Sequence, residues 1–300
     1  MSHLSSWLAS PPPDAAIEIA ADRISAATIG VRGSSAMVQS SASEPLPPGA
    51  VVPSLTGGNI TDPAAVAAAV RRTIDKLAAR PSRVALVLPD TIARVSLLRF
   101  DSIPARREDL DQLVRWQLKK AAPFPVEDAI VTYSEGARTP DGGGEFVVEL
   151  ARRDVIGEYE AVCDQAGVHA GLIDIATLSV VNLFLGSQAR PTGDWMVVHM
   201  RPEYTSLAIL RDEHMIFFRS RPEGEDDSLT DLVHQTAMYY EDRLSGGGFS
   251  RVLLGGTGRT AGAVDLARRS LEERIGGVVE QAEMSPLVGV LLRAEAEAAA

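Results

Sequence analysis

A glycine cluster near the C-terminus is the segment of this sequence whose residue types best suit phosphate binding. Residues 251–254 (RVLL) are typical of a strand whose last three residues are buried, and Gly255-Gly256-Thr257-Gly258 follow it directly. Glycines let backbone N–H groups approach a phosphate closely, because they carry no Cβ and tolerate positive φ angles. The same glycines suit an ordinary tight turn between a strand and a helix. The cluster therefore indicates either a nucleotide-binding loop or a structural turn.

Other patterns associated with catalysis or metal binding do not occur in the sequence. It has no G-x-x-x-x-G-K-[ST] P-loop, and residues 256–262 miss the G-x-G-x-x-G spacing by one residue. It has no G-x-S-x-G nucleophile elbow, and the five histidines lack the spacing that favours zinc. The one cysteine, Cys163, lies in a helical pattern and is expected to be a buried thiol. We therefore expect no catalytic residue and no metal site.

The composition is that of an acidic globular protein. The 300 residues include 29 basic and 40 acidic side chains, and the net charge at pH 7 is −11. Such a charge repels phosphate backbones, so we expect no nucleic-acid partner. No segment approaches the roughly 18 consecutive apolar residues that a membrane span requires, and no signal peptide is recognisable. The sequence therefore predicts a cytoplasmic protein without a membrane span of its own.

The elements that would position the glycine cluster form two similar halves. Residues 14–80 predict strands, a loop rich in serine and proline, and a helix opened by Asp62-Pro63, an N-cap followed by proline. Residues 191–292 repeat this order with three short strands, a helix and the strand before the glycine cluster. This repetition predicts an α/β protein with two lobes. The other segments are a flexible N-terminus (1–13), a return helix with a linker (175–190) and a disordered tail (293–300).

Residues 81–174 predict an α+β insert in the first lobe. Its helix, residues 106–122, should end before Pro123, because proline lacks an N–H donor and clashes with the preceding turn. On this helix Trp116 lies off the apolar stripe, near Lys120. Such a tryptophan either packs against a neighbouring subdomain or anchors a partner peptide, and Phe124 has the same two possibilities.

Three segments, taken in order, resemble the PilM family of type IV pilus assembly proteins. They are residues 45–77 with GNITDP, residues 84–133 with SIPARREDLDQLVRWQLKKAAPFPVEDAIVTY, and residues 228–258 with YYEDRL and SRVLLGGTG. The resemblance implies an actin-like fold with RNase H-like subdomains 1A and 2A and an FtsA-like insert. The short stretch between Arg221 and Ser228 implies that subdomain 2B is missing. FtsA-like division proteins and the cytoplasmic half of GspL are the next most similar families.

The resemblance also implies which residues occupy the nucleotide site. Members that bind ATP carry an Asp-x-Gly-Ser-type turn after the first strand, and the matching positions, Glu18 to Arg23, contain no glycine. At the second hairpin His199 replaces the metal-facing acid, Arg201 replaces the glycine, and Pro202 removes a donor. We therefore expect neither ATP nor magnesium as a cofactor, and no ATP hydrolysis. The residues implied for this degenerate site are Glu18, Arg23, Arg201, Gly255, Gly256, Thr257 and Gly258.

The function implied by the resemblance is docking. In the family, a groove beside the insert receives the N-terminal cytoplasmic tail of a membrane-anchored partner, PilN. We therefore expect a cytoplasmic adaptor for pilus biogenesis and twitching motility, bound to the inner membrane through a PilN-like partner and able to form homo-oligomers. The residues expected to contact the partner are Trp116, Lys120 and Phe124. The competing hypothesis is an active actin-like ATPase or sugar-kinase-like enzyme on the same fold.

Overall fold

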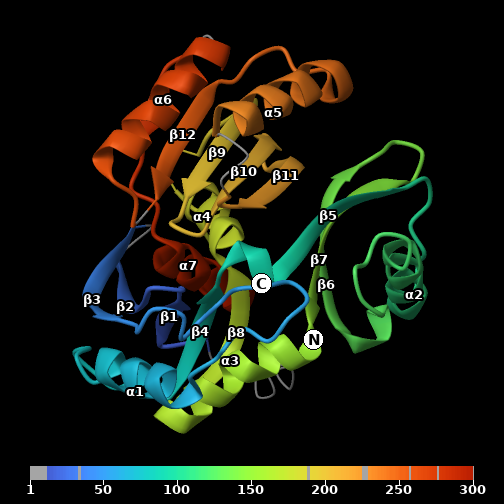
Figure 1. Ribbon diagram of the computed structural model, residues 1–300. Coiled ribbons are helices and arrows are strands. Elements are labelled where there is room, and N and C mark those ends of the chain that lie inside the picture. The colour runs from blue at the N-terminus through green and yellow to red at the C-terminus, as the bar shows by residue number, and fades with distance from the viewer. Residues whose placement is uncertain are drawn as a thin grey trace.

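Two five-stranded sheets form the cores of two lobes, and a three-stranded sheet forms an insert beside them (Figure 1). The structure is a computed structural model that describes residues 12–32, 35–187, 190–224, 229–256, 258–275 and 277–299. Helix α4 (Ala176–Leu185) lies between the two large sheets, and α7 (Pro286–Ala299) packs against it. The arrangement confirms the predicted α/β fold with two lobes and an α+β insert.

The first lobe is built on a sheet with the strand order β3-β2-β1-β4-β8. Its elements are β1 (Ala15–Ile19), β2 (Arg23–Arg32), β3 (Ser35–Pro45), α1 (Pro63–Ile74), β4 (Arg83–Leu88), α3 (Arg153–Ala166) and β8 (His169–Ile175). The first three strands are antiparallel, and β4 and β8 extend the sheet in parallel from β1. Helices α1 and α3 cover one face while α4 and α7 cover the other, so β1 is buried along its whole length.

Local signals determine where the helices of the first lobe begin and end. The Asp62 carboxylate accepts a hydrogen bond from Ala65 N at 3.0 Å, and Pro63 occupies the first helical position of α1. Gly167 ends α3 with a φ of 84°, in the left-handed region that favours glycine. Asn59 of the GNITDP motif is fully buried, and its Oδ1 accepts a hydrogen bond from Tyr159 Oη at 3.0 Å. The motif therefore ties the loop before α1 to α3.

The second lobe repeats this plan with the strand order β11-β10-β9-β12-β13. Its elements are β9 (Asp194–Met200), β10 (Tyr204–Arg211), β11 (His214–Pro222), α5 (Leu229–Leu244), β12 (Arg251–Gly256), α6 (Ala261–Ile275) and β13 (Val279–Gln281). Helices α5 and α6 cover one face of the sheet, and α4 packs on the other. Because β11 ends at Pro222 and α5 begins at Leu229, the connection has no room for subdomain 2B, as predicted.

The insert is a three-stranded antiparallel sheet with a helix on one face. Its elements are β5 (Ala93–Phe100), α2 (Arg107–Leu118), β6 (Ala129–Arg138) and β7 (Gly144–Arg152). Strand β7 lies in the middle, so β6 has a free edge. Helix α2 ends at Leu118 rather than at residue 122, and the chain then turns before Pro123. No helix in the part of the chain that the structure describes is both long and apolar enough to span a bilayer.

Two segments differ from the sequence prediction. Strands β4 and β8 and helix α3 belong to the core of the first lobe, so the insert is shorter than residues 81–174. Helix α7 continues to Ala299, where the sequence predicts a disordered tail over residues 293–300. Leu287, Val290 and Leu291 of this helix are buried against the first sheet, and this packing stabilises the helix. Of the predicted flexible segment 1–13, residues 1–11 lie outside the described residues.

Candidate functional site

Three turns meet between the lobes: the turn from β1 to β2, the turn from β9 to β10, and the segment after β12. The Glu18 carboxylate and the Arg201 guanidinium form an ion pair with an Oε1–Nη2 distance of 2.8 Å, and their side chains are 8% and 2% exposed. Ala21 N donates a hydrogen bond to Glu203 Oε1 at 3.2 Å. The first two turns therefore bond directly to each other.

Both charges of the Glu18–Arg201 pair are buried, and burying either charge without the other would cost free energy. Burial raises the pKa of Glu18, while the charges of Arg201 and Arg23 lower it. The Arg23 guanidinium forms an ion pair with Asp22 at 2.6 Å at the partly exposed rim of the junction. The guanidinium groups of Arg23 and Arg201 thus both have carboxylate partners within the protein.

The glycine cluster packs against the second turn. Gly256 has a φ of 153°, and a Cβ there would lie 1.8 Å from Met200 O. Gly258 has a φ of 81°, and a Cβ there would lie 2.6 Å from Pro202 Cγ and 3.0 Å from Arg23 Nη2. Gly255 faces the other way, toward Ala282 O. Other atoms of the protein therefore occupy the space next to these glycines, where a side chain would otherwise lie. Thr257 lies outside the described residues.

A buried polar network lies behind this ion pair. Asp90, which follows β4, accepts hydrogen bonds from Thr177 N at 2.9 Å and from Ser206 Oγ at 2.5 Å. The Thr177 hydroxyl also donates to Asp90, so it accepts a hydrogen bond from His199 Nδ1 at 2.8 Å. Burial and the Arg201 charge lower the pKa of His199 to about 3, which makes the ring neutral. The network connects the first lobe, α4 and the second lobe.

Sequence reasoning missed Asp90 and Thr177 as members of this network. A signal for Asp90 exists, because the residue comes immediately after the apolar strand β4 and Pro89. In open α/β sheets the crevice outside the carboxyl ends of the strands is the usual place of a site, so a polar residue there is a candidate. Thr177 gave no comparable signal, since it lies in an apolar helical pattern.

A groove runs along the free edge of β6 and is the second candidate site. It consists of two cavities of about 260 and 300 Å³ that share Thr132 and Glu149, and we call it the β6 groove. The first cavity lies between β6, α4, α7 and the turn from β10 to β11. The second lies between β6, α3 and β8, which is itself an edge strand. Two strand edges therefore face each other across the second cavity.

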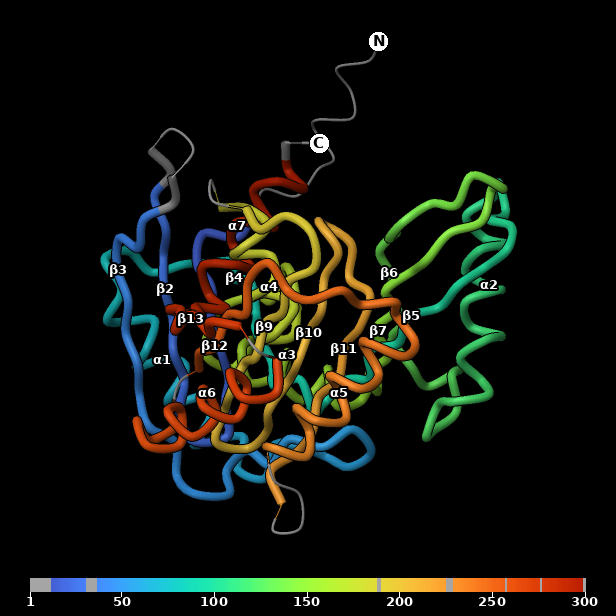
Figure 2. The backbone as a smooth tube through the Cα atoms, turned by 90° about the horizontal axis from the view of Figure 1, so that it is seen from above, coloured from blue at the N-terminus to red at the C-terminus, as the bar shows by residue number. Residues whose placement is uncertain are grey.

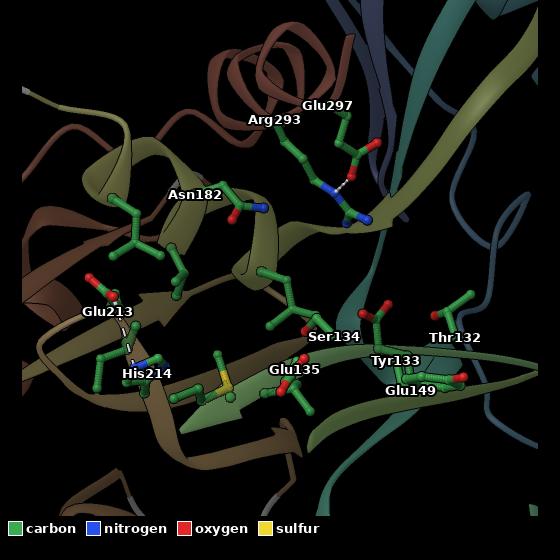
Figure 3. Close-up of a pocket in the computed structure, with 17 residues that line it drawn as sticks. Thr132, Tyr133, Ser134, Glu135, Glu149, Asn182, Glu213, His214, Arg293 and Glu297 are labelled. Atoms are coloured by element: carbon green, nitrogen blue, oxygen red, sulfur yellow. Dashed lines mark hydrogen bonds and ion pairs between the residues drawn. The ribbon is translucent and has the colours of Figure 1, made fainter. Parts of the chain in front are cut away.

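Carboxylates dominate the charge of the β6 groove. Its only lysine or arginine among the described lining residues is Arg293, which α7 projects toward the side chains of β6 and β7 (Figure 3). Arg293 forms ion pairs with Asp174 Oδ2 at 3.2 Å and with Glu297 Oε1 at 2.8 Å. The acidic residues that line the groove are Glu135, Glu149, Glu160, Asp174, Glu213 and Glu297.

The residues expected to contact a partner lie outside the β6 groove. Trp116 is 57% exposed on α2, at the outer edge of the insert (Figure 2), and Lys120 Nζ lies 4.2 Å from the centre of its ring. The alternative that Trp116 packs on a neighbouring subdomain is therefore wrong. Phe124 is half-buried and packs against the core of the insert itself. Helix α2 covers the face of the sheet opposite Glu149, because successive strand residues point to opposite faces.

The two similar lobes and the turns that meet between them define a protein of the actin-like ATPase fold. A Bacteroides thetaiotaomicron protein with this fold and unknown function matches with a TM-score of 0.53 and 11% identity, over 98% of each chain. The chain belongs to the PilM family: the family model described as type IV pilus assembly protein PilM matches residues 16–243.

Solved structures agree with this assignment. A PilM-PilN type IV pilus biogenesis complex matches with a TM-score of 0.78 and 15% identity, covering 95% of this chain and 98% of that one. The cytoplasmic domain of EpsL, an inner-membrane component of the Vibrio cholerae type II secretion system, matches with a TM-score of 0.53 and 10% identity, over 94% of each chain. At these identities the likenesses show the fold. A search of curated proteins found no match.

Proposed function

We propose that this protein is a cytoplasmic adaptor of a type IV pilus or related secretion machine. In this proposal the β6 groove binds the N-terminal cytoplasmic tail of a PilN-like protein and thereby links the adaptor to the inner membrane. Membership of the PilM family and the likeness to a PilM-PilN complex support a partner of this kind. Self-association is a separate expectation, which sedimentation of the purified chain would test.

The observation that carries the proposal is the free edge of β6, which faces the β8 edge across a cavity. An edge strand presents unpaired N–H and C=O groups, and an extended peptide can pair with them as an added strand. Apolar side chains line the floor of this cavity and would pack against side chains of the bound segment. They are Leu88, Ile92, Ile130, Ala151, Ile156, Leu172, Ile173 and Ile175.

A pair of variants tests where the tail binds. Thr132→Trp places a large ring where the two cavities meet, so it should weaken binding of the tail peptide by at least about tenfold, or about 1.4 kcal/mol. Trp116→Ala is the matched control, because it removes an exposed ring from the opposite face of the insert. Calorimetric titration of the full chain measures both, and circular dichroism checks that both variants fold. Loss of binding in Trp116→Ala alone would contradict the proposal and assign the tail to α2.

We further propose that the protein does not hydrolyse ATP. The Glu18 carboxylate, near the end of β1, is paired with Arg201, and Pro202 lacks a backbone donor at the second turn. Protein atoms also occupy the space beside Gly256 and Gly258. These residues do not fit a magnesium triphosphate, which needs free carboxylates and converging N–H donors.

Titration with Mg-ATP and an assay of phosphate release test this second proposal. Neither binding at micromolar concentration nor turnover is expected. Micromolar binding accompanied by turnover would instead favour the competing hypothesis of an active ATPase or a sugar-kinase-like enzyme. Arg201→Gly restores the small residue at the second turn and is the variant to compare with the natural chain.

A further inference from the structure

The β6 groove contains one half-buried acid that forms no ion pair with a described residue. Glu149 lies on the central strand of the insert and lines both cavities. Among the described residues, none donates a hydrogen bond to its carboxyl group or forms an ion pair with it. We propose that the groove selects a partner segment with a lysine or arginine, and that Glu149 holds this basic side chain where the cavities meet. This inference rests on the proposed docking function.

The charges next to Glu149 are already paired, and Glu160, the other groove acid without an ion pair among the described residues, is exposed. Asp174 accepts hydrogen bonds from Ile175 N at 2.8 Å and Ser179 Oγ at 3.1 Å, besides its ion pair with Arg293. Arg293 divides its donors between Asp174 and Glu297. A basic side chain brought by the ligand would supply the donors that Glu149 lacks.

The shape of the β6 groove agrees with an extended basic segment. A strand added to β6 would run past Thr132, whose cross-strand neighbour on β7 is Glu149. Side chains of an extended segment alternate between its two faces, so one of them can point at Glu149 while its neighbours point away. The excess of carboxylates on the groove walls would attract a cationic segment and repel an acidic one.

Binding of a cation at this position would be linked to a proton. Burial, with the charges of Asp174 and Asp90, raises the pKa of Glu149 to about 8, and Arg293 opposes this effect. Glu149 is therefore mostly protonated at neutral pH in the free groove, and a bound ammonium or guanidinium group would ionise it. The affinity should rise by up to about tenfold per pH unit from pH 6 to pH 8 and then level off.

The titratable groups that face Glu149 or line the same cavities are Asp174 on β8, Arg293 and Glu297 on α7, Asp90 after β4, Glu135 on β6, Glu160 on α3, and Glu213 and His214 at the turn from β10 to β11.

Calorimetric titration of the full chain tests the inference. The probe is a synthetic peptide of the N-terminal cytoplasmic segment of the PilN-like protein encoded with this chain. Its arginines are replaced singly by citrulline and its lysines by norleucine. We expect one replacement to weaken binding about tenfold or more at pH 8 and to remove the pH dependence. Titrations in buffers of different ionisation enthalpy should show close to one proton released at pH 7.

Glu149→Gln should reproduce the effect of that replacement, and Glu145→Gln is the matched control. Gln keeps the shape of Glu149 and cannot ionise, and Glu145 lies on the same strand but lines neither cavity of the β6 groove. If the peptide binds equally well to Glu149→Gln, or with a flat pH profile, the inference is overturned and the docking function stands. If the peptide fails to bind at every pH, the docking function itself is contradicted, and the inference falls with it.

Discussion

The junction between the lobes and the β6 groove both contain buried carboxylates, but their charges are compensated differently. At the junction, Glu18 is paired with Arg201, and the turns on either side are bonded to each other. In the groove, Arg293 compensates Asp174 and Glu297, while Glu149 has no such partner among the described residues. A buried charge that is satisfied internally supports the fold, whereas one that is not satisfied favours a ligand. Under the proposed function, this difference separates a closed junction without nucleotide chemistry from a groove that binds a partner.

Breaking the junction pair should produce the largest effect. Arg201→Met leaves the Glu18 carboxylate buried without its ion pair, so the free energy of unfolding at pH 7 should fall by about 4 kcal/mol. The deficit should shrink as the pH falls from 7 toward 4.5, because a buried acid with a raised pKa costs stability only where the unfolded chain has lost its proton. Urea denaturation at pH 7 and pH 4 measures both values.

The double variant Glu18→Leu/Arg201→Met controls for the lost packing of the arginine. Removal of both charges should recover most of the stability, since an apolar pair of similar volume can replace a buried ion pair. If Arg201→Met alone were as stable as the natural chain, the junction would not be the closed, self-satisfied site that the comparison requires.

The packing of the glycine cluster is the next feature to test. Gly256→Ala puts a Cβ 1.8 Å from the backbone oxygen of Met200, so we expect a loss of about 3 kcal/mol. Gly262→Ala is the matched control, because a Cβ there meets no atom within 4 Å. It should be neutral or slightly stabilising in α6. Thermal and urea unfolding measure both. A neutral Gly256→Ala would show that this turn is open rather than filled.

Replacement of Glu149 should give the smallest change in stability, and it should stabilise the protein rather than destabilise it. The folded-state pKa of Glu149 is raised to about 8 from 4.5, so the natural chain should lose stability as the pH rises between these values. Glu149→Gln should remove this loss and be more stable by about 2 kcal/mol at pH 8, after allowance for solvent screening. Unfolding curves from pH 5 to pH 9 test the prediction. A natural chain with the same pH dependence as the variant would contradict it.

The residues of the junction between the lobes could be predicted from the sequence, because each family motif consists of residues that are close together along the chain. Glu18, Arg23, Arg201 and Gly258 were expected to lie together, and the structure brings them together between the lobes. Their geometry could not be predicted, since the Glu18–Arg201 contact joins residues from different sheets. The β6 groove has no sequence signature, because its walls come from elements far apart along the chain.

The amino-acid sequence alone determined the α/β class, the two similar halves and the cap at Asp62. These features depend on hydrophobic periodicity and on residues within a few positions of each other. Only the tertiary structure decided that β4 and β8 join the first lobe, that α7 packs back on it, and that no described residue forms an ion pair with Glu149. Sheet order, burial and charge pairing depend on contacts between distant segments, and those contacts exist only after the chain has folded.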